Sequence, residues 1–163
     1  MKKIVLVSLL ALAMMMLNCQ TEQADALTDD VIVKIEEIVN GELEAFFDGA
    51  EEFNSEIMSE FLSEDIHFAA NGNIRIGKDA TADAFDTSFR GVRSQQLTMD
   101  ASHVNVLSRD YALQTVQGVF VPTVEDGVEE GRYQFALTIA WTNIRDRWLM
   151  QQYHYSMHPI SNN

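Results

Sequence analysis

The chain has 163 residues, of which 25 are Asp or Glu and 11 are Lys or Arg, so its net charge is -14 at pH 7. A charge of this sign repels nucleic acid and anionic lipid, and we therefore expect no nucleic-acid partner. The length is typical of one domain that buries its own hydrophobic core.

The first 18 residues are built like a secretory signal peptide. Lys2 and Lys3 precede an apolar run from Ile4 to Leu17, and no acidic residue interrupts it. The run is shorter than the roughly 20 apolar residues that a transmembrane helix needs. We therefore expect residues 1–18 to be removed during export.

The only cysteine, Cys19, directly follows this run. The segment Met16-Leu17-Asn18-Cys19 resembles the lipobox of bacterial lipoproteins, although Asn18 replaces the usual small residue. The resemblance implies that Cys19 carries a lipid, which would anchor the protein to a membrane of the cell envelope through a tether of residues 19–26. The alternative is ordinary cleavage after Ala24-Asp25-Ala26, which has the small-x-small form.

The mature chain opens with a helical pattern. Thr28 can cap a helix whose first turn holds Asp29 and Asp30. A second, shorter helix is predicted from Glu51 to Leu62. The apolar positions of the first helix are Val31, Ile35, Ile38 or Val39, Leu43 and Phe46, and those of the second are Phe53, Ile57, Met58 and Phe61.

A hairpin and a third helix come next. Asn71-Gly72 separates the short β-forming runs 66–70 and 73–76, which is a strong hairpin signal. Residues 79–89 then predict a helix that Gly91 ends.

Beyond Gly91 the apolar period changes to two. This pattern predicts four strands, at about residues 97–107, 111–121, 132–144 and 148–157, that form an antiparallel meander. The acidic segment 125–131 contains two glycines and predicts an exposed loop. We expect an α+β domain over residues 27–159, with a sheet of about six strands and three N-terminal helices, followed by a short tail at 160–163.

The order of these elements resembles the nuclear transport factor 2-like superfamily, which includes SnoaL-like and ketosteroid-isomerase-like domains. The local marks are Ser63-Glu64-Asp65 before the first strand, Ile76-Gly77-Lys78-Asp79-Ala80 at the third helix, and Trp148 followed by His154-Tyr155-Ser156. The resemblance implies a curved sheet wrapped around helices, a pocket at the wide end of this cone, and a homodimer formed through the sheet.

The last strand supplies the candidate site. Strand side chains alternate, so Trp148, Gln152, His154 and Ser156 are expected to share one face with Met150 and His158, while Tyr153 and Tyr155 face the other way. The resemblance implies that this face lines the pocket. The predicted ligand-binding residues are Trp148, Gln152, His154, Ser156, Phe61 and Phe85.

His154 is the best candidate for a general acid or base, because an imidazole titrates near neutral pH. The alternative is a histidine that only stabilises the sheet. His67 is a second candidate base whose face the hairpin register leaves open. The ketosteroid-isomerase branch has a catalytic carboxylate in this region, but residues 66–70 contain none, which puts that mechanism in doubt.

No cofactor or metal is expected. The chain lacks a glycine-rich phosphate loop. His154 and His158 would lie about 13 Å apart along a strand, which is too far for two ligands of one ion. Two functions remain: a non-catalytic envelope domain that binds a small, largely apolar ligand or a partner, which we favour, and a SnoaL-like isomerase, dehydratase or hydrolase with His154 as its acid or base.

Overall fold

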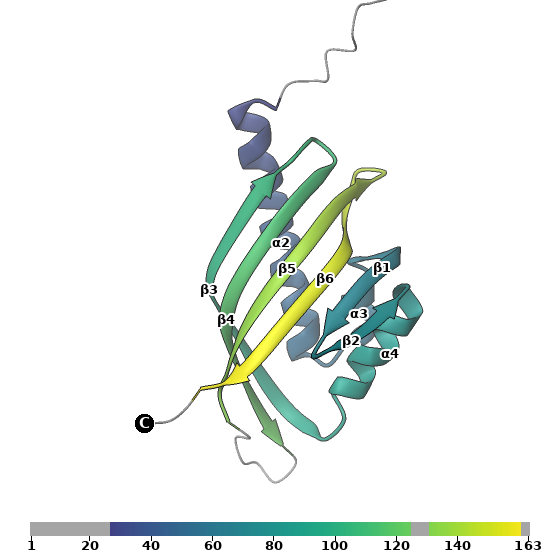
Figure 1. The fold of residues 1–163 in the computed structure, drawn as a ribbon, viewed down its shortest axis with the longest axis vertical. Helices are drawn as coiled ribbons and strands as arrows, with labels where there is room; N and C mark the ends of the chain where they lie inside the picture. The colour runs from purple at the N-terminus through teal and green to yellow at the C-terminus, as the bar shows by residue number, and fades with distance from the viewer. Residues whose placement is uncertain (1–26, 125–130, 161–163) are drawn as a thin grey trace, which may run out of the picture.

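Six strands form one curved sheet in the computed structural model, which describes residues 27–124 and 131–160 (Figure 1). The sheet order is β2-β1-β6-β5-β4-β3. Its strands are β1 (Leu62–Ala70), β2 (Asn73–Ile76), β3 (Val92–Val106), β4 (Tyr111–Val124), β5 (Tyr133–Ile144) and β6 (Arg147–Pro159). Strands β3 to β6 form the predicted antiparallel meander, whereas β1 runs parallel to β6, so the sheet is mixed. The predicted α+β fold class is confirmed.

The helix α2 (Asp29–Glu51) lies across one face of the sheet (Figure 1). Its buried apolar positions recur three or four residues apart, which produces a single stripe toward the sheet. They are Ile35, Val39, Leu43, Phe46 and Ala50. Thr28 occupies the expected N-cap position but makes no side-chain capping hydrogen bond. The helix is five residues longer than the apolar pattern ending at Phe46 indicated.

Two shorter helices follow, α3 (Ser55–Ser59) and α4 (Lys78–Ser88). Phe53 breaks the helical path with a φ of 56°, and the Asn54 side chain then caps α3 by accepting a hydrogen bond from the Ile57 amide at 3.0 Å. The predicted start of the second helix at Glu51 is therefore wrong, because Glu51 still belongs to α2. The third predicted helix agrees with α4 within one residue.

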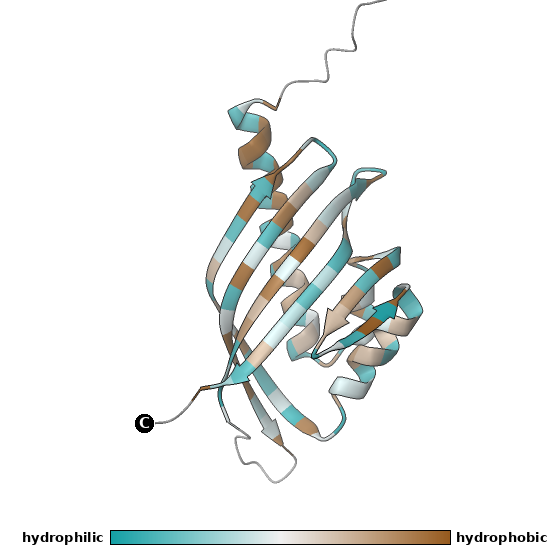
Figure 2. Cartoon of the chain, viewed as in Figure 1, coloured by the Kyte–Doolittle hydropathy of each residue, from teal (hydrophilic) through white to brown (hydrophobic). Residues whose placement is uncertain are grey.

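The predicted hairpin of β1 and β2 is confirmed. Asn71 and Gly72 both have positive φ, 49° and 79°, as a type I′ turn requires. The residues that follow the turn pair in antiparallel register with the end of β1. Apolar and polar residues alternate along β4 and β5, as the bands in Figure 2 show, so one face of these strands is in the core.

A buried polar network joins α2 to three strands. The Trp141 indole donates to Gln114 Oε1 at 2.8 Å, and Gln114 Nε2 donates to Asn40 Oδ1 at 2.9 Å and to Ser102 Oγ at 3.0 Å. Gln114 is fully buried, so these bonds satisfy groups that would otherwise lose their water partners. The network fixes α2 against β3, β4 and β5.

The strand β6 contains a bulge at Gln151. Trp141 pairs with Met150 and Ala140 pairs with Gln152, so Gln151 is an extra residue opposite β5. Its side chain donates to Asp65 Oδ1 at 3.0 Å. Beyond this residue the alternation of β6 is displaced by one position.

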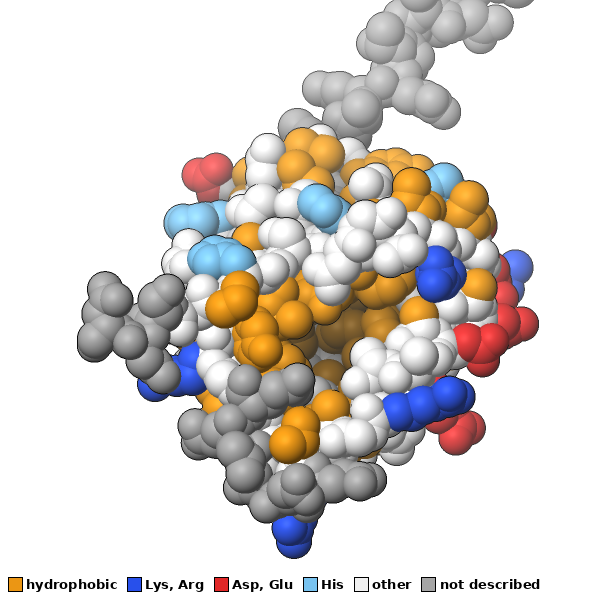
Figure 3. All heavy atoms as spheres, turned by 60° about the horizontal axis from the view of Figure 1, so that its bottom comes forward, with side chains coloured by type: hydrophobic (Ala, Val, Ile, Leu, Met, Phe, Trp, Pro, Cys, Tyr) orange, Lys and Arg blue, Asp and Glu red, His pale blue; other side chains and the backbone are white. Residues whose placement is uncertain are grey.

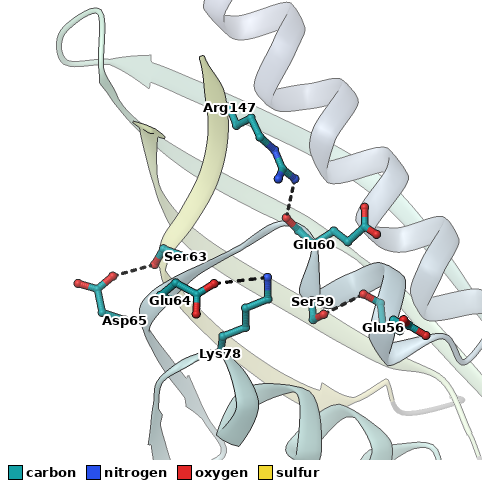
Figure 4. A network of polar contacts seen from close by, with 8 residues as sticks. All are labelled: Glu56, Ser59, Glu60, Ser63, Glu64, Asp65, Lys78 and Arg147. Carbon is teal, nitrogen blue, oxygen red and sulfur yellow. Dashed lines mark hydrogen bonds and ion pairs between the residues drawn. The ribbon is translucent and has the colours of Figure 1, made fainter. Parts of the chain in front are cut away.

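Figure 4 shows the polar contacts around the start of β1. Ser63 Oγ donates to the Asp65 oxygen that Gln151 also contacts, at 3.2 Å, and Lys78 pairs with Glu64 at 3.8 Å. The hydrogen bonds from Gln151 and Ser63 lower the pKa of Asp65 below its ordinary value of 3.8. Within the described ranges, no helix is both long and apolar enough to cross a membrane.

Candidate functional site

A cavity of about 390 Å³ lies between the concave face of the sheet and the three helices. It is built from the C-terminal part of α2, Met58 of α3, the end of α4 and the ends of five strands. Figure 3 shows the end of the molecule opposite the start of α2, where apolar side chains surround a hollow. The volume suits a small organic ligand.

Aromatic rings form the floor of the cavity. Phe46 contacts Phe85 and Tyr153 with ring centroids 5.7 Å apart in each pair, and Phe68 stacks on Tyr153 at 5.5 Å. Edge-to-face and offset contacts of this kind fix the rings relative to one another. The wall is completed by Phe47, Phe89, Phe120, Phe135, Leu97, Leu137 and Met157.

Gly118 of β4 permits this wall to form. A Cβ at this position would collide with the carbonyl of Thr98 and with the ring of Phe135. The ring of Phe135 therefore lies directly against the β4 backbone, where only glycine leaves enough room. A larger residue would require both the Thr98 backbone and the Phe135 ring to move.

Among the described residues of the cavity wall, five polar side chains differ in their hydrogen bonds: Ser88, Gln95, Tyr133, Tyr153 and Tyr155. Tyr155 accepts a hydrogen bond from Asn71 Nδ2 at 3.3 Å, Ser88 donates to the Phe85 carbonyl at 2.7 Å, and Gln95 donates to the Ala50 carbonyl. Tyr153 is only 7% exposed, and its hydroxyl has no hydrogen-bond partner among the described residues. Burial raises the pKa of Tyr153, so its phenol stays protonated.

The lining residues that the structure describes include no ionisable acid or base other than the phenols. None of these described residues is Asp, Glu, His, Lys, Arg or Cys. The described part of the chain also holds no group of three or more His, Cys, Asp or Glu side chains arranged to bind a metal ion. The arrangement favours burial of an apolar molecule and offers hydroxyl and amide groups for orientation.

The structure brings only one of the predicted ligand-binding residues into this cavity, namely Phe85. Phe61 packs edge-on against Phe46, with centroids 6.2 Å apart, behind the lining. Trp148 is buried and borders a second hollow of about 490 Å³, which also contacts Lys34 and Asp146.

The predicted placement of Gln152, His154 and Ser156 is wrong. All three are exposed on the convex face, whereas Tyr153 and Tyr155 line the cavity. The cause is the bulge at Gln151, because an extra residue exchanges the two faces of the strand beyond it. His67 is exposed on the outer side as well.

Sequence reasoning missed Tyr153, Tyr155 and Met157 as wall residues, and it missed Gln95. Tyr153, Tyr155 and Met157 do alternate along β6, but the face predicted from Trp148 holds only as far as the bulge at Gln151, which alternation does not reveal. Gln95 belongs to a polar stretch at the start of β3, where no apolar period indicates a strand. Its inward orientation follows from its bond to α2.

The same fold occurs in solved structures. A protein from Novosphingobium aromaticivorans, assigned provisionally as a scytalone dehydratase, matches with a TM-score of 0.73 at 9% identity over 83% of this chain and 92% of that chain. The hexachlorocyclohexane dehydrochlorinase LinA-type3 from Novosphingobium barchaimii matches with a TM-score of 0.72 at 9% identity, over 83% and 97%. A nuclear transport factor 2-like superfamily protein from Salmonella enterica matches with a TM-score of 0.70 at 15% identity, over 81% and 96%.

At these identities the likeness shows the fold alone, and no similar curated protein is found. The family assignment comes from a separate comparison. The family model of the SnoaL-like domain matches residues 39–161, which include the cavity-lining parts of α2, α4 and the sheet. The chain therefore belongs to the SnoaL-like domain family.

Proposed function

We propose that this protein is an exported, lipid-anchored domain whose cavity binds a small, largely apolar ligand without converting it. The observation that carries the proposal is the composition of the cavity lining. Aromatic and aliphatic side chains dominate it, and the described lining holds no carboxylate or imidazole that could act as general acid or base near neutral pH. Such a site gains affinity by removing apolar surface from water.

The alternative is a proton-transfer enzyme, as the names of two structural relatives suggest for those proteins. General acid–base catalysis requires a group within hydrogen-bond reach of the substrate. His154 lies on the opposite face of the sheet, and the raised pKa of Tyr153 keeps this phenol protonated near neutral pH, so it cannot take up a proton there. These features favour binding over catalysis.

The experiment is native mass spectrometry of the purified protein, followed by Nile red binding. We expect a carried ligand, or Nile red fluorescence that saturates with one dye per cavity. Ala84→Trp places an indole in the cavity wall and should abolish dye binding. Thr87→Trp on the exposed side of the same helix is the matched control. Recovery of the carried ligand in a chemically altered form after incubation would support the enzyme instead.

The anchor is proposed from the sequence, because Cys19 lies outside the described residues. Cys19→Ser should remove the acylation site and move the protein from the membrane fraction to the aqueous fraction. Persistence of the variant in membranes with an unchanged mature mass would contradict the lipid anchor.

We also propose a homodimer through the convex face of the sheet. Four paired rows cross β6, β5, β4 and β3 on this face without a single Asp, Glu, Lys or Arg. One row consists of His154, Thr138, Thr115 and His103, all of them exposed. The exposed bulge residue Asp100 of β3 adjoins these rows. In a chain of net charge -14, a face with so few charges is where two copies approach with the least repulsion.

Light scattering tests the dimer, and twice the monomer mass is expected. Thr138→Glu places a carboxylate near the centre of the face and should produce monomers, whereas Thr87→Glu on α4 should not. A native protein that stays monomeric at every concentration tested would contradict the dimer.

A further inference from the structure

Tyr153 carries a polar hydroxyl, and its side chain is buried among aromatic rings. Its ring contacts Phe46, Phe68 and Tyr155 at centroid distances of 5.7, 5.5 and 6.4 Å, and the side chain is 7% exposed. Within the described residues its hydroxyl has no partner, yet no fully buried polar atom is left unsatisfied. The hydroxyl therefore adjoins the cavity, which is the space from which a partner can reach it.

The other polar side chains of the cavity have less need of a hydrogen bond from a ligand. Tyr155, Ser88 and Gln95 each have a protein partner. The Tyr133 hydroxyl also lacks one among the described residues, but Tyr133 is half-buried and water can satisfy it. Among the lining hydroxyls of the described chain, that of Tyr153 combines deep burial with an open hydrogen-bonding position.

The charge of the site restricts the ligand further. No described lining residue carries a formal charge at neutral pH. A charged ligand would lose its hydration shell here without gaining a counter-charge, which strongly disfavours its binding. A neutral molecule avoids this loss.

We propose that the cavity selects a neutral ligand with an apolar, ring-containing body and one hydroxyl or carbonyl oxygen, which accepts a hydrogen bond from Tyr153 at the cavity floor. The inference rests on the proposed binding function and adds the class and orientation of the ligand. A phenol both donates and accepts, so a ligand hydroxyl can also donate to the Tyr153 oxygen. The aromatic floor then contacts the ligand body.

Competition against Nile red by three bicyclic probes tests the proposal. Naphthalene supplies the apolar body alone, 2-naphthol adds one hydroxyl, and 2-naphthoate adds a charge. One hydrogen bond predicts that 2-naphthol binds about three- to tenfold more tightly than naphthalene. We expect 2-naphthoate to be the weakest competitor. Naphthalene that competes as well as 2-naphthol, or 2-naphthoate that competes best, would overturn the proposal without any variant.

Tyr153→Phe removes the hydroxyl and keeps the ring. We expect the advantage of 2-naphthol over naphthalene to disappear in this variant, while naphthalene binding stays within about twofold of the unchanged protein. Tyr111→Phe, at an exposed position outside the cavity lining, is the control and should retain the advantage. An advantage that survives Tyr153→Phe would overturn the role of Tyr153. Failure of Nile red itself to bind the unchanged protein would instead reject the binding function.

Discussion

The two faces of β6 differ sharply although they come from the same short sequence. On the concave face Tyr153, Tyr155 and Met157 line an aromatic cavity. On the convex face Gln152, His154 and Ser156 are exposed. One extra residue, Gln151, decides which set lies inside. The chemistry of the cavity therefore depends on backbone register as much as on side-chain type.

Deletion of Gln151 should have the largest effect. The shortened strand would turn His154, Ser156 and His158 toward the core and would expose Tyr153 and Tyr155. Burial of polar groups and loss of aromatic packing together should rival the whole free energy of unfolding, about 5–15 kcal/mol. Thermal unfolding followed by circular dichroism should show no cooperative transition. Gln151→Ala keeps the register and should unfold cooperatively, whereas a native-like transition in the deletion variant would contradict the bulge.

Single substitutions on the two faces should change the free energy of unfolding by less than the deletion does. Phe46 is 1% exposed and contacts four other rings, so Phe46→Ala should lower the free energy of unfolding by about 3–5 kcal/mol. His154→Ala on the exposed face should change it by less than about 0.5 kcal/mol and should leave Nile red binding unchanged. Urea denaturation measures both values. A comparable loss in the two variants would contradict the placement of His154 outside the hydrophobic core.

Burial of Tyr153 on the concave face should also affect the stability of the protein at high pH. The pKa of Tyr153 is raised above its usual value of 10.0 by burial and, secondarily, by Tyr155. Below about pH 10 the Tyr153 phenol is protonated in both the folded and the unfolded protein, so its ionisation does not lower the free energy of unfolding there. Above that pH the unfolded chain releases a proton that the folded chain retains, so the free energy of unfolding falls by up to about 1.4 kcal/mol per pH unit.

Tyr153→Phe should remove this part of the decline, and Tyr111→Phe, at an exposed position, should not. Urea denaturation at several alkaline pH values supplies the slopes. Identical slopes in native and Tyr153→Phe protein would argue against burial of this phenol.

The smallest effect concerns Asp65, whose side chain accepts the hydrogen bond from the bulge residue. An NMR titration of the carboxyl carbons should give Asp65 a pKa below 3.8, because Gln151 and Ser63 stabilise the carboxylate. Its stabilising contribution is present above the unfolded pKa and declines as the pH falls through the folded value. Gln151→Ala should move the pKa of Asp65 back toward 3.8. An unchanged pKa would mean that Gln151 does not contact this carboxylate in solution.

The elements could be predicted from local patterns where those patterns persist over several residues. The heptad-like stripe of α2, the Asn71-Gly72 turn and the alternation in β4 and β5 each specify their own structure. The parallel pairing of β1 with β6 could not be predicted in this way, because it joins segments about 85 residues apart. The start of β3 was missed since polar residues dominate it.

The candidate site was less predictable than the fold. Alternation assigned a face to β6 from Trp148, and this assignment holds only as far as Gln151. The bulge belongs to a contact with Asp65 on another strand, so no local pattern in β6 indicates it. The need for Gly118 under Phe135 likewise arises only when two strands are brought together. The face of β6 and the need for glycine at position 118 both depend on contacts between distant segments, which local sequence patterns do not contain.

The start of α2 and the cavity lie toward opposite ends of the molecule (Figures 1 and 3). With 23 residues, α2 spans about 35 Å. Residues 19–26 reach at most about 28 Å when extended. A lipid on Cys19 would therefore keep the start of α2 within about 28 Å of the bilayer, and in an upright orientation the hollow of Figure 3 would face away from it. In that orientation, the ligand would exchange with the surrounding water or with a soluble donor, and not by lateral transfer from the lipid layer.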